Sequence, residues 1–180
     1  LALHYGLRIN QFNRLAQSGL LEYANNQPLT YNPSLGIYQQ GTALGFYSKA
    51  ESKQNYTNIE PRFTLAYRQE RSAWKASYQR VNQYLHLISN TTSPTPLDVW
   101  TPSGRYLKPQ QSDQWALGYV TERENGNSLE AEVFYKHTDN RYDYIDGAEL
   151  VANEAIEQIL LPGTARAYGL ELLFKKTEGK

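Results

Sequence analysis

Residues 166–176, RAYGLELLFKK, alternate between two kinds of side chain. Successive side chains of an extended strand point to opposite faces. One face would carry Tyr168, Leu170, Leu172 and Phe174, and the other would carry Gly169, Glu171, Leu173 and Lys175. The stretch therefore predicts a β-strand with one apolar and one mainly polar face. What covers the apolar face, a second sheet or lipid, decides the fold.

The same period-two alternation recurs along the chain, at residues 1–15, 62–68, 73–82, 113–121 and 129–137. The connections alternate in length. Short polar turns are expected at 69–72, at 122–128 around an Asn-Gly pair, and at 177–180, with long polar segments at 17–58, 83–112 and 138–165. The pattern predicts an all-β fold of about six antiparallel up-and-down strands.

One segment departs from this pattern. Residues 148–161, AELVANEAIEQILL, contain good helix formers and stop at Pro162-Gly163. A short helix and an extended lead into the last strand both remain open for this segment.

The composition excludes several classes of function. The net charge is zero, which gives no electrostatic reason to expect a nucleic-acid partner. The chain has no cysteine, and no apolar run approaches the roughly 18–20 residues of a spanning helix. Yet 15 tyrosines, five phenylalanines and three tryptophans occur in a chain of polar mean hydropathy, −0.67. Tyr and Trp suit a surface that is partly apolar and partly wet.

Two architectures remove the apolar faces from water and leave the charged faces wet. One is a soluble sandwich or lipocalin-like binding module, with the apolar face inward. The other is a transmembrane β-barrel, with the apolar face toward lipid and the polar face lining a wet lumen.

Three features favour the transmembrane barrel. Strands of roughly 9–11 alternating residues have the length that a tilted strand needs to cross the hydrocarbon layer. Short periplasmic turns and long extracellular loops are typical of outer-membrane barrels. Aromatic residues lie near strand ends, as in an interfacial girdle: Tyr67, Trp74, Trp115 and Tyr135.

On the transmembrane reading, the position of a residue in its strand assigns its environment. We expect lipid-facing side chains at Tyr168, Leu170, Leu172 and Phe174. We expect lumen-facing side chains at Arg8, Arg62, Lys75, Glu130, Glu132 and Glu171. Six strands are fewer than the about eight that close a bacterial barrel. This count, together with the absence of methionine, leads us to expect that residues 1–180 are part of a larger barrel domain.

Several stretches resemble the barrel of TonB-dependent outer-membrane receptors of Gram-negative bacteria, most closely the Bacteroidetes type. The resemblance rests on the order of four motifs rather than on any one of them. They are Glu60-Pro61-Arg62 at the start of a strand, Lys108-Pro109 leading to Ser112-Asp113, Tyr168-Gly169-Leu170-Glu171, and the opening LHYGLRINQFNRL at 3–15.

The resemblance implies a plugged barrel of about 22 strands, of which six would be roughly a quarter. It implies a receptor that takes up a scarce nutrient such as siderophore-iron, cobalamin or a glycan. It also implies coupling to the TonB complex through an N-terminal region that this chain lacks. An outer-membrane adhesin or structural barrel without a plug stays open as an alternative. The upstream sequence of the full gene would distinguish it from a receptor.

The residues suggest no catalytic, cofactor or metal site. The histidines His4, His86 and His137 have no partner at ligand spacing. No serine lies in a nucleophile-elbow context, so we do not expect an enzyme. The best ligand-contact candidates, for a small molecule or an oligosaccharide above the pore, are the loop aromatics Tyr31, Tyr38, Tyr47, Trp100 and Tyr106.

Overall fold

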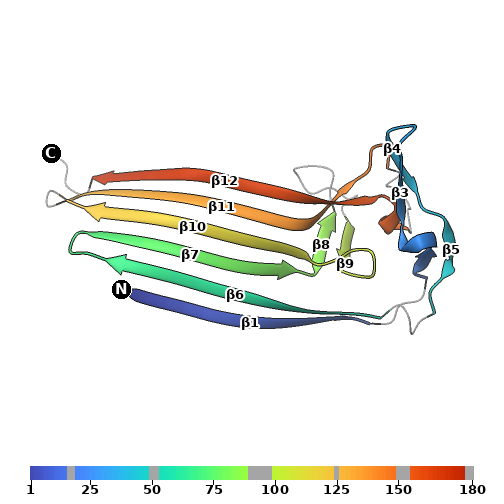
Figure 1. Cartoon of the computed structure of the whole chain (residues 1–180), viewed down its shortest axis with the longest axis horizontal. Helices are drawn as coiled ribbons and strands as arrows, with labels where there is room; N and C mark the ends of the chain where they lie inside the picture. Colours follow the sequence, from blue (N-terminus) through green and yellow to red (C-terminus); the bar gives the residue numbers. More distant parts are fainter. Residues whose placement is uncertain (16–18, 49–52, 89–98, 124–125, 149–154, 177–180) are drawn as a thin grey trace.

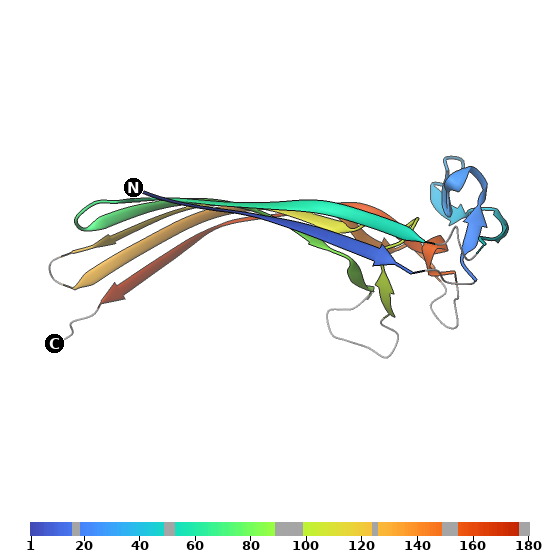
Figure 2. The same ribbon diagram turned by 90° about the horizontal axis from the view of Figure 1, so that it is seen from below.

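Six long antiparallel strands form one curved sheet in the computed structural model (Figures 1 and 2). The structure describes residues 1–15, 19–48, 53–88, 99–123, 126–148 and 155–176. The strands of the large sheet, in their spatial order, are β1 (Ala2–Arg14), β6 (Gln54–Arg68), β7 (Ser72–Gln83), β10 (Gln110–Glu122), β11 (Asn127–Tyr144) and β12 (Leu160–Lys176). This order is the predicted up-and-down arrangement of antiparallel strands, and it confirms the fold class.

The connections follow the predicted asymmetry. Both short turns lie at one end of the sheet, which we call the turn end, together with the start of the first strand and the end of the last strand (Figure 1). The Gln69 N–H donates to the Ser72 carbonyl at 2.7 Å in the first turn, and the Arg123 N–H donates to the Asn127 carbonyl at 2.8 Å in the second. The expected turn at 177–180 lies outside the described residues. The opposite end, which we call the loop end, carries all the long connections.

The strands run further toward the loop end than the alternation predicted. β6 begins at Gln54, β11 continues to Tyr144 and β12 begins at Leu160. The pairing of β11 with β12 continues beyond the predicted end of the strand at residue 137, because a bulge leaves Asn140 unpaired and the ladder then resumes. Asn140 has a positive φ of 55°, and its side-chain amide donates to the Pro109 carbonyl at 2.9 Å. A bulge of this kind interrupts the alternation of apolar and polar side chains, so the alternation does not predict the part of β11 beyond it.

The long segments also contain short strands of their own, which the sequence did not predict. These are β2 (Leu21–Tyr23), β3 (Leu29–Asn32), β4 (Ile37–Gln40), β5 (Ala43–Phe46), β8 (Leu85–Ile88) and β9 (Val99–Pro102). They pair as β2–β5, β3–β4 and β8–β9. Single-turn 3₁₀ helices occur at Ala24–Asn26 (η1) and Ile156–Gln158 (η2). In the ambiguous segment 148–161, the described part therefore contains η2 and, after Ile159, the start of β12.

The buried core of the described chain lies at the loop end, not between two layers. Ile88, Leu107, Ile159 and Leu160 form it, with the Tyr142 side chain packed against it. No described helix is long and apolar enough to cross a membrane. The soluble alternative required the apolar face of the sheet to be covered. Instead, that face is open along its length, with Leu3 61% and Leu170 63% exposed.

The close approach of Phe134 explains the glycine in the YGLE motif. Gly169 pairs with Phe134 across β11 and β12. A Cβ at Gly169 would lie 2.8 Å from Cε1 and 2.9 Å from Cζ of the Phe134 ring. The ring thus fills the space above the glycine, a device that compensates for glycine in a strand.

We expect Gly169→Ala to lower the stability of the full-length receptor by about 1–3 kcal/mol, because the Phe134 ring must move. Thermal unfolding of the detergent-solubilised receptor, followed by the loss of the heat-modifiable gel band, measures the change. In a Phe134→Ala background the same substitution should cost almost nothing. An equal loss in both backgrounds would show that the ring contact is not the cause.

Candidate functional site

A row of six aromatic side chains crosses the apolar face of the sheet, one from each strand. Strand pairing places them directly beside one another, in the order Tyr5, Phe63, Tyr78, Trp115, Tyr135 and Tyr168. The ring centroids of Tyr78 and Trp115 are 5.3 Å apart, and those of Trp115 and Tyr135 are 5.8 Å apart. We call this set the aromatic row.

The apolar character of this face ends just beyond the aromatic row on four strands. The next residues toward the loop end pair in the order Arg80, Asp113, His137 and Arg166. The Arg80 guanidinium donates to both oxygens of Asp113, from Nε at 2.8 Å and from Nη2 at 3.0 Å. The Tyr78 hydroxyl also donates to Asp113, at 2.7 Å, and so joins the two rows. We call the second set the charged row.

A second, shorter aromatic group lies toward the turn end of the same face. Tyr67 pairs with Trp74, and Trp74 pairs with Tyr119, with ring centroids 4.5 Å apart for the latter two. We use the word level for a set of directly paired residues at one position along the strands. The four aromatics predicted to form one girdle therefore lie at two different levels. Tyr67 and Trp74 belong to the turn-end group, whereas Trp115 and Tyr135 belong to the aromatic row. Between the two levels the face is aliphatic: Leu3, Leu65, Ala76, Leu117, Val133 and Leu170.

The side chains predicted to face lipid occupy four successive levels of this apolar face. Tyr168 belongs to the aromatic row, Leu170 to the aliphatic level, and Leu172 pairs with Ala131 beside Tyr119. Phe174 pairs with Leu129 at the turn end. All four are well exposed in the chain by itself, between 63% and 79%.

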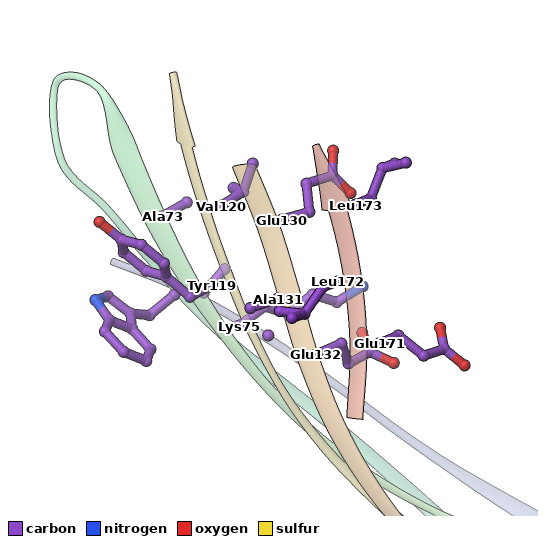
Figure 3. Close-up of a pocket in the computed structure, with 13 residues that line it drawn as sticks. Ala73, Lys75, Tyr119, Val120, Glu130, Ala131, Glu132, Glu171, Leu172 and Leu173 are labelled. Atoms are coloured by element: carbon purple, nitrogen blue, oxygen red, sulfur yellow. The ribbon is translucent and has the colours of Figure 1, made fainter. Parts of the chain in front are cut away.

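The side chains predicted to face the lumen all lie on the opposite face, with Arg8 and Arg62 further toward the loop end than the other four. Lys75, Gly118, Glu132 and Glu171 follow one another across four strands. Glu130 lies next to Glu132 on that face, and Figure 3 shows these carboxylates on the side opposite Tyr119. They line a shallow hollow together with Gly118, and residues of the apolar face such as Trp74, Tyr119 and Leu172 also border it. Within the described chain, none of the six predicted residues forms an ion pair with another of the six.

Glu60, from the Glu-Pro-Arg motif, has a buried carboxylate, which the sequence pattern did not predict. It is 1% exposed, and its Oε1 accepts a hydrogen bond from the Asn82 backbone N–H at 2.7 Å. The pairing of β6 with β7 ends at Arg62 and Gln79, so the Asn82 N–H has no carbonyl partner on β6. The Glu60 carboxylate takes the place of that carbonyl. The guanidinium of Arg8 lies 3.9 Å from Oε2.

The loop aromatics predicted to contact a ligand separate into two kinds. The Tyr47 and Tyr106 hydroxyls are 3.0 Å apart and share a hydrogen bond, while Arg105 stacks over the Tyr47 ring at 4.6 Å. The backbone N–H of Tyr23 donates to the Tyr106 hydroxyl at 3.4 Å. Burial and the Tyr106 hydroxyl raise the pKa of Tyr47 to about 12, so the Tyr47 hydroxyl stays protonated. These tyrosines fasten two loops together.

The other three candidates present open rings. Tyr31 and Tyr38 face each other across the β3–β4 hairpin, with ring centroids 5.1 Å apart, and are 52% and 40% exposed. Trp100, on β9, pairs with Leu87 and is 61% exposed. The structure does not bring Trp100 into contact with the tyrosine pair.

His86 holds the β8–β9 hairpin from its buried side. It is 3% exposed, its Nε2 lies 2.9 Å from the Ser103 hydroxyl, and its ring meets the edge of Tyr142. Burial lowers the pKa of His86 below its usual range. His4 and His137 lie on β1 and β11, far from His86 in the sequence. The described residues contain no group of three or more His, Asp or Glu side chains that could hold a metal ion.

The lowered pKa of His86 predicts a hairpin that loosens in acid. The unfolded chain binds the proton more readily than the folded one, so the contribution of His86 is complete above about pH 6.5. It is lost as the pH falls below that value toward the lower pKa of the folded state. The hydrogen-exchange protection factors of residues 84–88 in the full-length receptor, corrected for the intrinsic exchange rate at each pH, should therefore fall on acidification. A His86→Gln variant should show no such fall; an equal loss of protection in both would exclude His86 as the cause.

Three comparisons place the chain among known proteins. Residues 1–177 match the family described as TonB dependent receptor-like, beta-barrel. No curated protein matches the chain significantly. Among solved structures, it is similar to a double mutant of the Serratia marcescens hemophore receptor HasR in complex with its hemophore HasA and heme, with 15% identity and a TM-score of 0.45. The similarity covers 96% of this chain and 27% of the HasR chain.

Proposed function

The chain belongs to the TonB-dependent receptor β-barrel family, and from this we propose that residues 1–180 form part of the wall of a receptor that imports a scarce nutrient. Proteins of this family reside in the outer membrane and are transporters rather than enzymes. The candidate nutrients are siderophore-iron, cobalamin and glycans. Energy would come from the TonB complex, through a region outside this chain.

The main support for the proposal of a barrel wall is that the aromatic row and the charged row lie side by side. Amphipathic rings prefer the boundary between hydrocarbon and headgroups, and charges are costly on the hydrocarbon side. Six rings in register, followed at once by Arg80, Asp113, His137 and Arg166, fit the outer boundary of a bilayer. A soluble sheet has no reason to align them.

From this boundary we propose an environment for each face of the sheet. The aliphatic level and its flanking aromatics contact lipid, including Tyr168, Leu170, Leu172 and Phe174. The opposite face, with Arg8, Arg62, Lys75, Glu130, Glu132 and Glu171, lines the lumen. The loop end is extracellular and the turn end is periplasmic, as short turns and long loops indicate.

The test of the transport function uses the intact receptor in its own membrane. Deleting the receptor gene should slow growth when one nutrient, either iron, cobalamin or an oligosaccharide, is limiting. Deleting the TonB gene should produce the same defect, and a receptor variant without its TonB-contacting region should fail to restore growth. Normal growth of the receptor deletion under all three limitations would contradict the proposal.

A further inference from the structure

The first long connection folds into a small module of its own. Its described residues 19–48 contain the two short sheets β2–β5 and β3–β4 and the η1 turn. Backbone hydrogen bonds close it on itself, from the Ala24 N–H to the Thr42 carbonyl at 2.9 Å and from the Tyr47 N–H to the Leu20 carbonyl at 2.8 Å. We call these residues the loop module, and Figures 1 and 2 both show it beyond the loop end of the large sheet. No described residue of the loop module belongs to the buried core at the loop end.

A polar seam joins the loop module to the second long connection, and Tyr106 lies at its centre. The Tyr106 hydroxyl accepts a hydrogen bond from the Tyr23 N–H and shares another with the Tyr47 hydroxyl. Its neighbour Arg105 donates from Nε to the Asn26 side-chain oxygen at 3.0 Å. Hydrogen bonds of this kind exchange with bonds to water at a small net cost. The seam can therefore part while the buried core stays intact.

Tyr23 makes the closed arrangement less favourable than it would otherwise be. It is 2% exposed, and its hydroxyl has no hydrogen-bond partner among the described residues. Its ring meets the edge of the Tyr106 ring, with ring centroids 5.1 Å apart. Burial and the nearby Glu157 carboxylate raise the pKa of Tyr23, so this hydroxyl stays protonated. A buried hydroxyl without a partner is unfavourable, and it regains hydrogen bonds to water when the module moves away.

From these contacts we propose that the loop module is a lid, which detaches from the loop end as one body and is held closed by Tyr106 and Arg105. The Gln158 amide donates to the Gly41 carbonyl at 3.1 Å and adds a contact from the third long connection. The hydrogen bonds inside the module are separate from those of the seam, so the module keeps its fold while it moves. The buried Tyr23 hydroxyl keeps the preference for the closed state small, so both states are populated.

The test measures the distance between spin labels on cysteines placed at Ser34 and Lys108 of the purified full-length receptor. Ser34 lies in the exposed turn between β3 and β4, and Lys108 is exposed just before β10. We expect a main short distance and a minor longer one. Tyr106→Phe should raise the ratio of the longer to the shorter population roughly tenfold, because it removes the two hydrogen bonds to Tyr23 and Tyr47. Tyr23→Phe should lower that ratio, because it removes only the hydroxyl without a partner.

Two further variants make the test specific. Tyr38→Phe removes a hydroxyl from the exposed side of the same module and should leave the ratio unchanged. Arg105→Ala removes the hydrogen bond to Asn26 from an exposed position and should raise the ratio without disturbing the core. In every variant, the Ala24 and Tyr47 amides should keep their wild-type protection from hydrogen exchange, because their hydrogen bonds lie inside the module.

An unchanged distance distribution in both Tyr106→Phe and Arg105→Ala would overturn the inference, and so would a raised ratio in Tyr23→Phe. Loss of protection at Ala24 and Tyr47 would mean that the module unfolds rather than moves as one body, which also contradicts the inference. None of these outcomes depends on which nutrient is imported or on TonB. The proposed transport function therefore stands or fails separately.

Discussion

Ala76→Arg should strongly reduce the amount of folded full-length receptor in the outer membrane, whereas Ser77→Arg should leave it nearly unchanged. The two residues are neighbours on β7 and are both small. Ala76 pairs with Leu65 and Leu117 on the aliphatic level of the apolar face, while Ser77 pairs with Thr64 and Ala116 on the polar face. An arginine on the lipid side costs about 2–4 kcal/mol at the bilayer midplane and less toward its boundary, whereas one in a wet lumen costs little.

The measurement is the fraction of receptor that shows the heat-modifiable folded band in outer-membrane preparations. The matched pair removes the effects of strand position, side-chain size and added charge, because these are the same for both variants. Equal loss in the two variants would mean that both faces have the same environment. That result would contradict the assignment of the apolar face to lipid.

Glu60→Ala should destabilise the receptor by about 1.5–3 kcal/mol, the usual worth of a hydrogen bond to a charged group. The substitution leaves the Asn82 N–H without its acceptor at the point where the β6–β7 ladder ends, and it leaves Arg8 without its nearby carboxylate. Glu60→Gln keeps an oxygen acceptor and should lose less. Chemical denaturation of the detergent-solubilised receptor gives both values.

Glu132→Ala is the control for this prediction. Glu132 is an exposed carboxylate that pairs directly with Glu171, so its removal relieves a like-charge contact. We expect Glu132→Ala to be neutral or slightly stabilising. If it proved as costly as Glu60→Ala, loss of any carboxylate from this face would explain both results, and the special role of Glu60 would be wrong.

Alternation of side chains predicted the strands and their two faces, because the side-chain period of a strand is fixed by backbone geometry. The assignment of Leu170 and Glu171 to opposite faces needs nothing more than their adjacency in the sequence. The resemblance to TonB-dependent receptors is confirmed by the family to which the chain belongs. The narrower likeness to the Bacteroidetes type stays a prediction.

Features that depend on register or long-range contacts were not predictable in the same way. The aromatic row joins Tyr5 to Tyr168 through four other strands, and a shift of one residue in any pair would break it. The hydrogen bond between Tyr47 and Tyr106 joins residues 59 positions apart. The burial of Glu60 depends on where the β6–β7 ladder stops. Local patterns contain no information about any of these three arrangements.

The most direct test of the membrane assignment is the labelling of single cysteines placed at Leu170 and Glu171 of the full-length receptor in its membrane. The 180 residues contain no cysteine that would interfere. We predict that a cysteine at position 170 reacts with a bilayer-soluble maleimide and resists a charged, water-soluble one. A cysteine at position 171 should show the opposite preference. If the two positions react alike with both probes, the sheet does not separate lipid from a wet lumen, and the account of this chain as a barrel wall is wrong.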